Sequence, residues 1–130
     1  MSAIAHGIDM VDCERLGRSI ARHGRRFLER VFTAAELEYC DARKRRLEHL
    51  AGRFAAKEAV MKVLGTGWRA GMAWTDIEVT NDPMGKPEVL LSGRCQELAD
   101  RMGLDRILIS ITHVERHAVA SAIGCGRERY

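Results

Sequence analysis

The sequence LAGRFAAKEAVMKVLGTG, residues 50–67, predicts one long amphipathic helix around which the rest of the chain is organised. Alanine, phenylalanine, valine, methionine and leucine recur in it between charged residues, as in a helix that packs through an apolar face. Gly65 or Gly67 supplies the left-handed residue that ends such a helix. We expect the helix to begin near Leu47 or slightly earlier.

The charged residues of this helix allow two interpretations. Positions four apart lie above one another, so Glu58 and Lys62 share one face, and Arg53 and Lys57 share a neighbouring one. One carboxylate beside several cations can hold a metal ion and a phosphate group side by side. The alternative is a solvated charged face, which is the commoner meaning of such a pattern.

The length and composition of the chain are typical of a soluble globular protein, and we expect a single domain over residues 1–130. Hydrophobic residues make up 46% of the chain and charged residues 30%. No apolar run approaches the roughly 20 residues that cross a bilayer. Residues 1–11 lack the basic start of a signal peptide and contain His6 and Asp9. We therefore expect a cytoplasmic location and no membrane partner.

The cysteine spacing and the charge distribution limit the kinds of site and partner that the chain can have. No C-x-x-C pair occurs, which argues against a zinc site or a redox motif and favours free thiols. The net charge is only +3, but arginines crowd residues 15–30 and basic residues fill 43–46, patterns that attract polyanions or acidic proteins. No Phe or Tyr alternates with these basic residues, so we expect no nucleic-acid partner. The four cysteines are Cys13, Cys40, Cys95 and Cys125.

The N-terminal part of the chain predicts a strand followed by a helix. Residues 4–11 alternate with the period of a half-buried strand. Asp9 lies within it, either near solvent at a strand end or as a ligand held on a rigid element. Asp12 can cap a helix that begins near Cys13 and ends at Gly24.

A capping box marks the best helix start in the chain. Thr33 can accept from the backbone N–H of Glu36 while the Glu36 side chain reaches back, and Phe32 can pack on Leu37. Thr33 and Glu36 are thus expected to have a structural role.

The second half of the chain predicts mainly strands. Helices first and strands later favour an α+β domain in which a small antiparallel sheet packs with the long central helix and shorter helices. The turn formers at 81–87 indicate a hairpin. The expected elements are strands at 74–80 and 88–91, a helix at 93–102, strands at 106–113 and 118–123, and a frayed tail at 124–130.

Three groups of residues could converge to form a site: Asp9, Glu58 and residues 110–113. Two carboxylates suit Mg²⁺, which binds few protein groups and completes its octahedron with water and phosphate oxygens. Lys62 could neutralise the same phosphate as a compact charge. A diphosphate substrate fits this description. Taken alone, His113 is better explained as an ordinary polar residue at a strand end.

Six motifs match one known family in their order along the chain. They are GIDMV at 7–11, RRFLERVFTAAEL at 25–37, the central stretch at 50–67, WTDIEV at 74–79, GKPEVLLSG at 85–93 and SITH at 110–113. With these motifs the chain resembles the holo-acyl-carrier-protein synthases, the small trimeric class of 4′-phosphopantetheinyl transferases. The resemblance extends over nearly the whole chain.

The resemblance implies an enzyme of fatty acid biosynthesis. It would transfer the phosphopantetheine arm of coenzyme A to a serine of apo acyl carrier protein and release adenosine 3′,5′-bisphosphate. Asp9 and Glu58 fall on the family's metal-ligand positions for Mg²⁺, and Lys62 would stabilise charge on the diphosphate beside them. A carboxylate, or water bound to the metal, could take the serine proton.

The resemblance also implies a homotrimer with active sites at subunit interfaces. His113 falls on a position that contacts the 3′-phosphate of coenzyme A, reached from a neighbouring subunit. The residues expected to bind coenzyme A are Arg53, Lys62, Gly65, Thr66, Ser110, Thr112 and His113.

A basic helix face is expected to bind the carrier protein, because acyl carrier proteins are strongly acidic in the helix after the modified serine. Arg15 falls on a family contact position. The residues expected to help it are Arg18, Arg22 and Arg26.

Two alternatives stay open at the level of sequence. One is the same transfer to a carrier domain of a polyketide or peptide synthetase. The other is a noncatalytic basic module that binds nucleic acid or acidic proteins, which requires Asp9 and Glu58 to be incidental.

Overall fold

A computed structural model describes residues 1–65 and 71–127 of the chain. Its mixture of helices and antiparallel strands confirms the predicted α+β class. In chain order the elements are β1 (Ser2–Asp12), α1 (Cys13–Val31), α2 (Ala34–Asp41), α3 (Arg46–Leu64), the short 3-10 helix η1 (Trp74–Asp76), β2 (Ile77–Asn81), β3 (Pro87–Leu91), α4 (Gly93–Met102), β4 (Leu104–Val114) and β5 (His117–Gly126).

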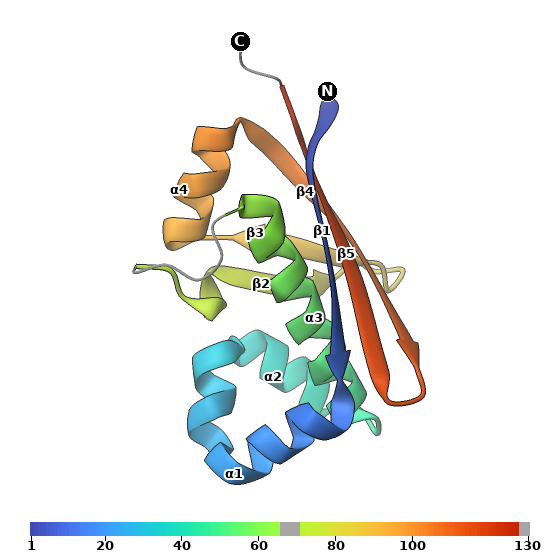
Figure 1. Ribbon diagram of the computed structural model, residues 1–130. Coiled ribbons are helices and arrows are strands. Elements are labelled where there is room, and N and C mark those ends of the chain that lie inside the picture. The colour runs from blue at the N-terminus through green and yellow to red at the C-terminus, as the bar shows by residue number, and fades with distance from the viewer. Residues whose placement is uncertain (66–70, 128–130) are drawn as a thin grey trace.

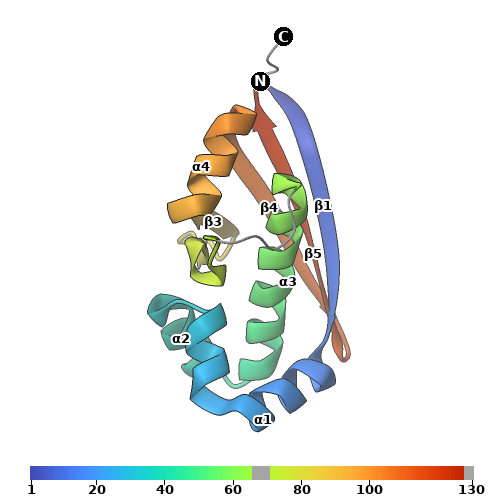
Figure 2. The same cartoon turned by 60° about the vertical axis from the view of Figure 1, so that its left-hand side comes forward.

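Three of the strands form one antiparallel sheet in the order β1-β5-β4, with the C-terminal strand in the centre. The register places Asp9 of β1 opposite Ala120 of β5, and His113 of β4 opposite Ala118. The predicted hairpin of β2 and β3 forms a separate two-stranded ladder. The long helix α3 lies along one face of the three-stranded sheet, with α2 and α4 on the same side (Figures 1 and 2).

Small residues let α3 approach the sheet closely. Ala51, Ala55 and Ala59 of α3 are fully buried, as are the small residues of β5 that alternate toward the helix. A side chain added at Gly7 would collide with the carbonyl oxygen of Ala59 and lie 2.9 Å from the Cβ of Lys62. Since no side chain fits between the backbones at this point, the N-terminal strand rests directly on the central helix.

The helix ends follow the predicted capping chemistry. The Asp12 side chain accepts from two backbone N–H groups at the start of α1, and Thr33 and Glu36 form the capping box of α2. Gly65, at φ 72°, ends α3 in the left-handed conformation. Gly24, at φ 62°, interrupts α1 where the sequence predicts a helix end, and a further helical segment continues to Val31.

Two predicted boundaries are wrong. The strand predicted from Trp74 begins only at Ile77, because Asp76 folds residues 74–76 into a 3-10 turn by accepting from the Ala73 backbone N–H at 3.1 Å. The tail predicted to fray from residue 124 continues as β5 to Gly126, because it pairs with β1 on one side and β4 on the other.

The face of the three-stranded sheet that points away from α3 carries exposed apolar side chains. Ile8 and Met10 of β1 are 54% and 63% exposed, and Leu108 and Val114 of β4 are 39% and 63% exposed. Within residues 1–65 and 71–127, no helix covers this face (Figure 2). Apolar patches of this kind mark contact surfaces. None of the helices described is long and apolar enough to cross a membrane.

The close contact between β1 and α3 predicts that Gly7→Ala destabilises the protein by about 2 kcal/mol or more, because the added methyl group must push two backbones apart. The expected result is a lower midpoint in urea unfolding. Gly17→Ala is the matched control, since its nearest neighbour is the flexible tip of Leu47 at 3.2 Å. A Gly7→Ala protein as stable as wild type would contradict the packing account.

Candidate functional site

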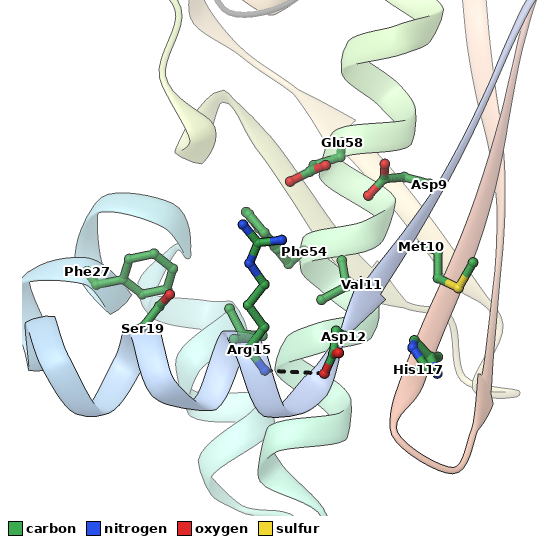
Figure 3. Close-up of a pocket in the computed structure, with 11 residues that line it drawn as sticks. Asp9, Met10, Val11, Asp12, Arg15, Ser19, Phe27, Phe54, Glu58 and His117 are labelled. Carbon is green, nitrogen blue, oxygen red and sulfur yellow. Dashed lines mark hydrogen bonds between the residues drawn. The ribbon is translucent and has the colours of Figure 1, made fainter.

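The carboxylates of Asp9 and Glu58 lie together where β1 crosses α3 (Figure 3). Asp9 stands on the face of β1 that points to the helix, two residues after the close contact at Gly7. Lys62, one turn along α3 from Glu58, donates to Asp9 Oδ1 at 3.1 Å and to the Ile8 carbonyl oxygen at 2.7 Å. The structure thus brings these three predicted residues together.

The two carboxylates carry more negative charge than the site compensates. Partial burial, then the neighbouring Asp9, raises the pKa of Glu58 from its usual value near 4.5 to about 7, while Lys62 acts in the opposite direction. Near neutral pH the pair therefore retains a proton in part of the molecules. A divalent cation between the two carboxylates would remove this repulsion, so the residues fit a metal ion.

The character of the pair fits magnesium better than a transition metal. In the described part of the chain, no three His, Cys, Asp or Glu residues cluster as ligands. A closed zinc site needs such a set, whereas Mg²⁺ is held by one or two carboxylates and completes its coordination with water and substrate oxygens.

A pocket of about 550 Å³ opens beside the carboxylates, between β1, α1 and α3. Phe27 of α1 and Phe54 of α3 supply apolar wall, and Arg15 reaches into the pocket from the first turn of α1 (Figure 3). Ser19 and His117 add polar groups to its lining. The pocket has room for an organic group next to a phosphate bound at Asp9 and Glu58.

The predicted arginines of α1 do not form one continuous row. Arg15, Arg18 and Arg22 line a shallow depression along the first segment of the helix. Arg26 follows the interruption at Gly24 and belongs to the second segment. All four are exposed, so they can meet a partner surface.

A second pocket, of about 190 Å³, lies on another face of α3 and is lined by Arg53 and His113. Arg53 is 4% exposed, donates to Asn81 Oδ1 at 2.7 Å and lies over the Tyr39 ring. Its Nε is buried and has no hydrogen-bond partner among the described residues. The His113 Nε2 lies 2.7 Å from the Glu48 carbonyl oxygen. No residue lines both this pocket and the one beside Asp9.

The remaining residues predicted to bind coenzyme A do not line either of these two pockets in the described part of the chain. Ser110 and Thr112 alternate with the inward-facing residues of β4 and are exposed on the far side of the sheet from Arg53. Gly65 ends α3. Thr66 lies outside the described residues.

The interpretation of residues 50–67 as a solvated charged face is wrong for two of their four charged residues, because Arg53 is buried and Lys57 is completely so. No role for Lys57 is predicted from the sequence. Its ammonium pairs with Glu36 Oε1 at 2.7 Å. The charge pattern of α3 could have suggested a buried partner, but nothing local identifies that partner as Glu36.

Comparisons with known proteins show the family to which the chain belongs. Residues 5–121 match the model of the 4′-phosphopantetheinyl transferase superfamily. The holo-[acyl-carrier-protein] synthase of Koribacter versatilis is 45% identical over 117 residues, covering 90% of this chain and 94% of that protein.

Solved structures are similar over almost the full length. The holo-[acyl-carrier-protein] synthase of Neisseria meningitidis superposes with a TM-score of 0.87 at 29% identity, covering 95% of this chain and 98% of that one. The Helicobacter pylori synthase in complex with coenzyme A gives 0.81 at 30% identity, covering 92% and 99%. The chain therefore belongs to the 4′-phosphopantetheinyl transferase superfamily, as a member of its holo-acyl-carrier-protein synthase family.

Proposed function

We propose that this protein transfers the 4′-phosphopantetheine group of coenzyme A to a serine of apo acyl carrier protein, in the presence of Mg²⁺. The observation that carries the proposal is the paired carboxylates of Asp9 and Glu58 with Lys62 beside them, at the mouth of a pocket. The names of the relatives and the coenzyme A complex of the Helicobacter pylori protein support the choice of substrates.

The chemistry follows from these three side chains. Asp9 and Glu58 would hold Mg²⁺, which supplies Lewis acidity to the diphosphate oxygens when bound. Lys62 would move from Asp9 to the diphosphate and stabilise the negative charge that grows there. The serine oxygen attacks the phosphorus that bears the pantetheine arm, and the bond to the bridging oxygen breaks, so that adenosine 3′,5′-bisphosphate leaves. The serine proton passes to a carboxylate or to water.

The 3′-phosphate of coenzyme A would bind at the pocket of Arg53 and His113. The guanidinium of Arg53 lines a small cavity together with His113, and its buried Nε has no hydrogen-bond partner among the described residues, which favours an anion as the missing partner. Because this pocket shares no lining residue with the one at Asp9, one coenzyme A molecule is proposed to use the carboxylates of one chain and Arg53 with His113 of another.

The apolar outer face of the three-stranded sheet supports the homotrimer that such shared sites require. Ile8 and Met10 on β1, with Leu108 and Val114 on β4, offer exposed apolar side chains on this face for contact between copies. Ser110 and Thr112 share this face, so a contact of this kind would bring them close to a neighbouring chain.

The protein is further proposed to act in the cytoplasm on the carrier protein of fatty acid biosynthesis. Cys13, Cys40, Cys95 and Cys125 are all free, as expected in a reducing compartment. A carrier domain of a polyketide or peptide synthetase is the alternative acceptor.

Incubation with coenzyme A, Mg²⁺ and apo acyl carrier protein is expected to add the mass of one phosphopantetheine to the carrier, read by intact mass spectrometry. Glu58→Gln should lower the rate about 100-fold, because it removes charge needed at the transition state, and chelation of the metal should abolish transfer. Glu97→Gln, a surface glutamate of α4, is the matched control. Transfer by Glu58→Gln at the wild-type rate would exclude the ligand role, and no mass gain would favour the noncatalytic basic module.

Arg18→Glu is expected to raise KM for the carrier protein about tenfold and to leave KM for coenzyme A nearly unchanged, because it reverses a charge that meets an acidic partner and does not line the pocket beside Asp9. Steady-state rates with each substrate varied in turn measure this, and the effect should shrink at high salt. Arg101→Glu on α4 makes the same charge change away from α1. Equal changes in both KM values would contradict the docking role.

The wild-type protein is expected to sediment as a trimer, and Ile8→Glu combined with Leu108→Glu should shift it toward monomer, because the contact would bury two charges. Transfer should fall together with trimer content. Met84→Glu, at a 92% exposed residue of the β2–β3 turn, is the control. A wild-type protein that is monomeric and fully active would overturn the shared site.

A further inference from the structure

The Glu36–Lys57 ion pair is completely buried and joins four elements of the fold. Lys57 lies on α3 and donates to Glu36 Oε1, to the Trp74 carbonyl oxygen at 3.2 Å and to the Ile77 carbonyl oxygen. Three acceptors thus satisfy the three donors of the ammonium. Burial lowers the pKa of Lys57, and Glu36 opposes that shift.

The carboxylate of Glu36 also accepts hydrogen bonds from the cap of its own helix and from β2. Oε1 accepts from the Thr33 backbone N–H, which completes the cap of α2, and Oε2 accepts from the Val79 backbone N–H in β2 at 2.9 Å. The cap alone needs no lysine, and the core would tolerate apolar residues here, because a buried ion pair is seldom a net source of stability. Stability alone therefore does not explain why the Glu36–Lys57 pair is buried here.

The contact at Trp74 leads to the pocket beside the metal-binding carboxylates. The Trp74 ring packs on the Phe54 ring, with centroids 5.4 Å apart. Phe54 in turn lines the pocket next to Glu58, as Figure 3 displays. Lys57 precedes Glu58 on α3, so the residue that holds Trp74 is also adjacent to a proposed metal ligand.

We propose that the Glu36–Lys57 pair positions the Trp74–Phe54 wall of the substrate pocket, and so sets the affinity for coenzyme A. This inference rests on the proposed function, because the wall would contact the part of coenzyme A next to the diphosphate. Lys57 has no exposed surface and cannot touch a substrate itself. It is a positioning residue that acts through the tryptophan backbone.

The double variant Glu36→Gln with Lys57→Met separates positioning from stability. Removing one charge alone would leave the other buried without a partner, whereas the double variant leaves two neutral side chains of similar shape. We expect it to stay folded with an unfolding midpoint near wild type, to raise KM for coenzyme A at least about fivefold and to leave kcat within about twofold. Wild-type KM in the folded double variant would overturn the proposal.

Tryptophan emission gives a readout that does not depend on turnover. The chain has two tryptophans, so in a Trp68→Phe background the emission reports Trp74 alone. The double variant is expected to shift this emission to the red, because the ring is released from Phe54. Unchanged emission would count against the proposal even if the wild-type protein proved inactive, and inactivity of the wild type would count against the proposed function alone.

Two further variants keep the test decisive. Trp74→Leu leaves the ion pair intact and removes the ring, so the same rise in KM is expected, and an unchanged KM would overturn the proposal should the double variant fail to fold. Val63→Ala weakens a buried contact on the sheet side of α3, away from the wall. It should lower the unfolding midpoint without changing KM, and an equal rise in KM would attribute the effect to stability.

Discussion

The close approach of α3 to the three-stranded sheet is the constraint on which the rest of the structure depends. The backbones of Gly7 and Ala59 are in contact, and a side chain at Gly7 would meet the Ala59 carbonyl oxygen and separate the layers. Because carboxylate side chains are short, Asp9 and Glu58 can face one another only across such a narrow gap. The packing of small residues is thus a precondition of the site. Gly7 weakens the strand because it has no side chain to pack, but it also fixes the distance between the carboxylates of Asp9 and Glu58.

One helix serves several purposes because its faces are used differently. The face of α3 that packs on the sheet carries small apolar side chains. The buried Lys57 lies on the side of the β2–β3 hairpin, and Glu58 with the exposed Lys62 lies next to Asp9 at the edge of the sheet. The buried charges hold neighbouring elements in place, whereas the exposed ones are free to change partner. Lys62, which pairs with Asp9 at 3.1 Å, illustrates the second kind, since an exposed ammonium loses little when it moves to a nearby anion.

Local patterns in the sequence predict much of this fold. The caps at Asp12 and Thr33, the stop at Gly65 and the alternation of β1 each depend on residues within a few positions, and each lies where expected. The two errors have different causes. Asp76 bends a segment whose alternation favours a strand, because it accepts from the Ala73 backbone N–H three residues before it. Gly126, by contrast, is ordered by distant contacts, because it pairs with β1 and with β4. The partner of Lys57 could not be predicted for the same reason, because the capping box already accounts for Glu36 locally.

The distribution of charge explains why the proposed site would need more than one chain. The pocket at Asp9 holds two carboxylates, whose repulsion raises the pKa of Glu58, while the buried guanidinium of Arg53 lies in a separate pocket on another face of the same helix. A substrate with a diphosphate and a further phosphate has charges that suit both places, one through a bridging cation and one directly. Under the proposal, a symmetric assembly brings the two binding places together without a larger domain. When copies of the chain meet through the outer face of the sheet, each contributes its carboxylates to one site and its arginine pocket to the next.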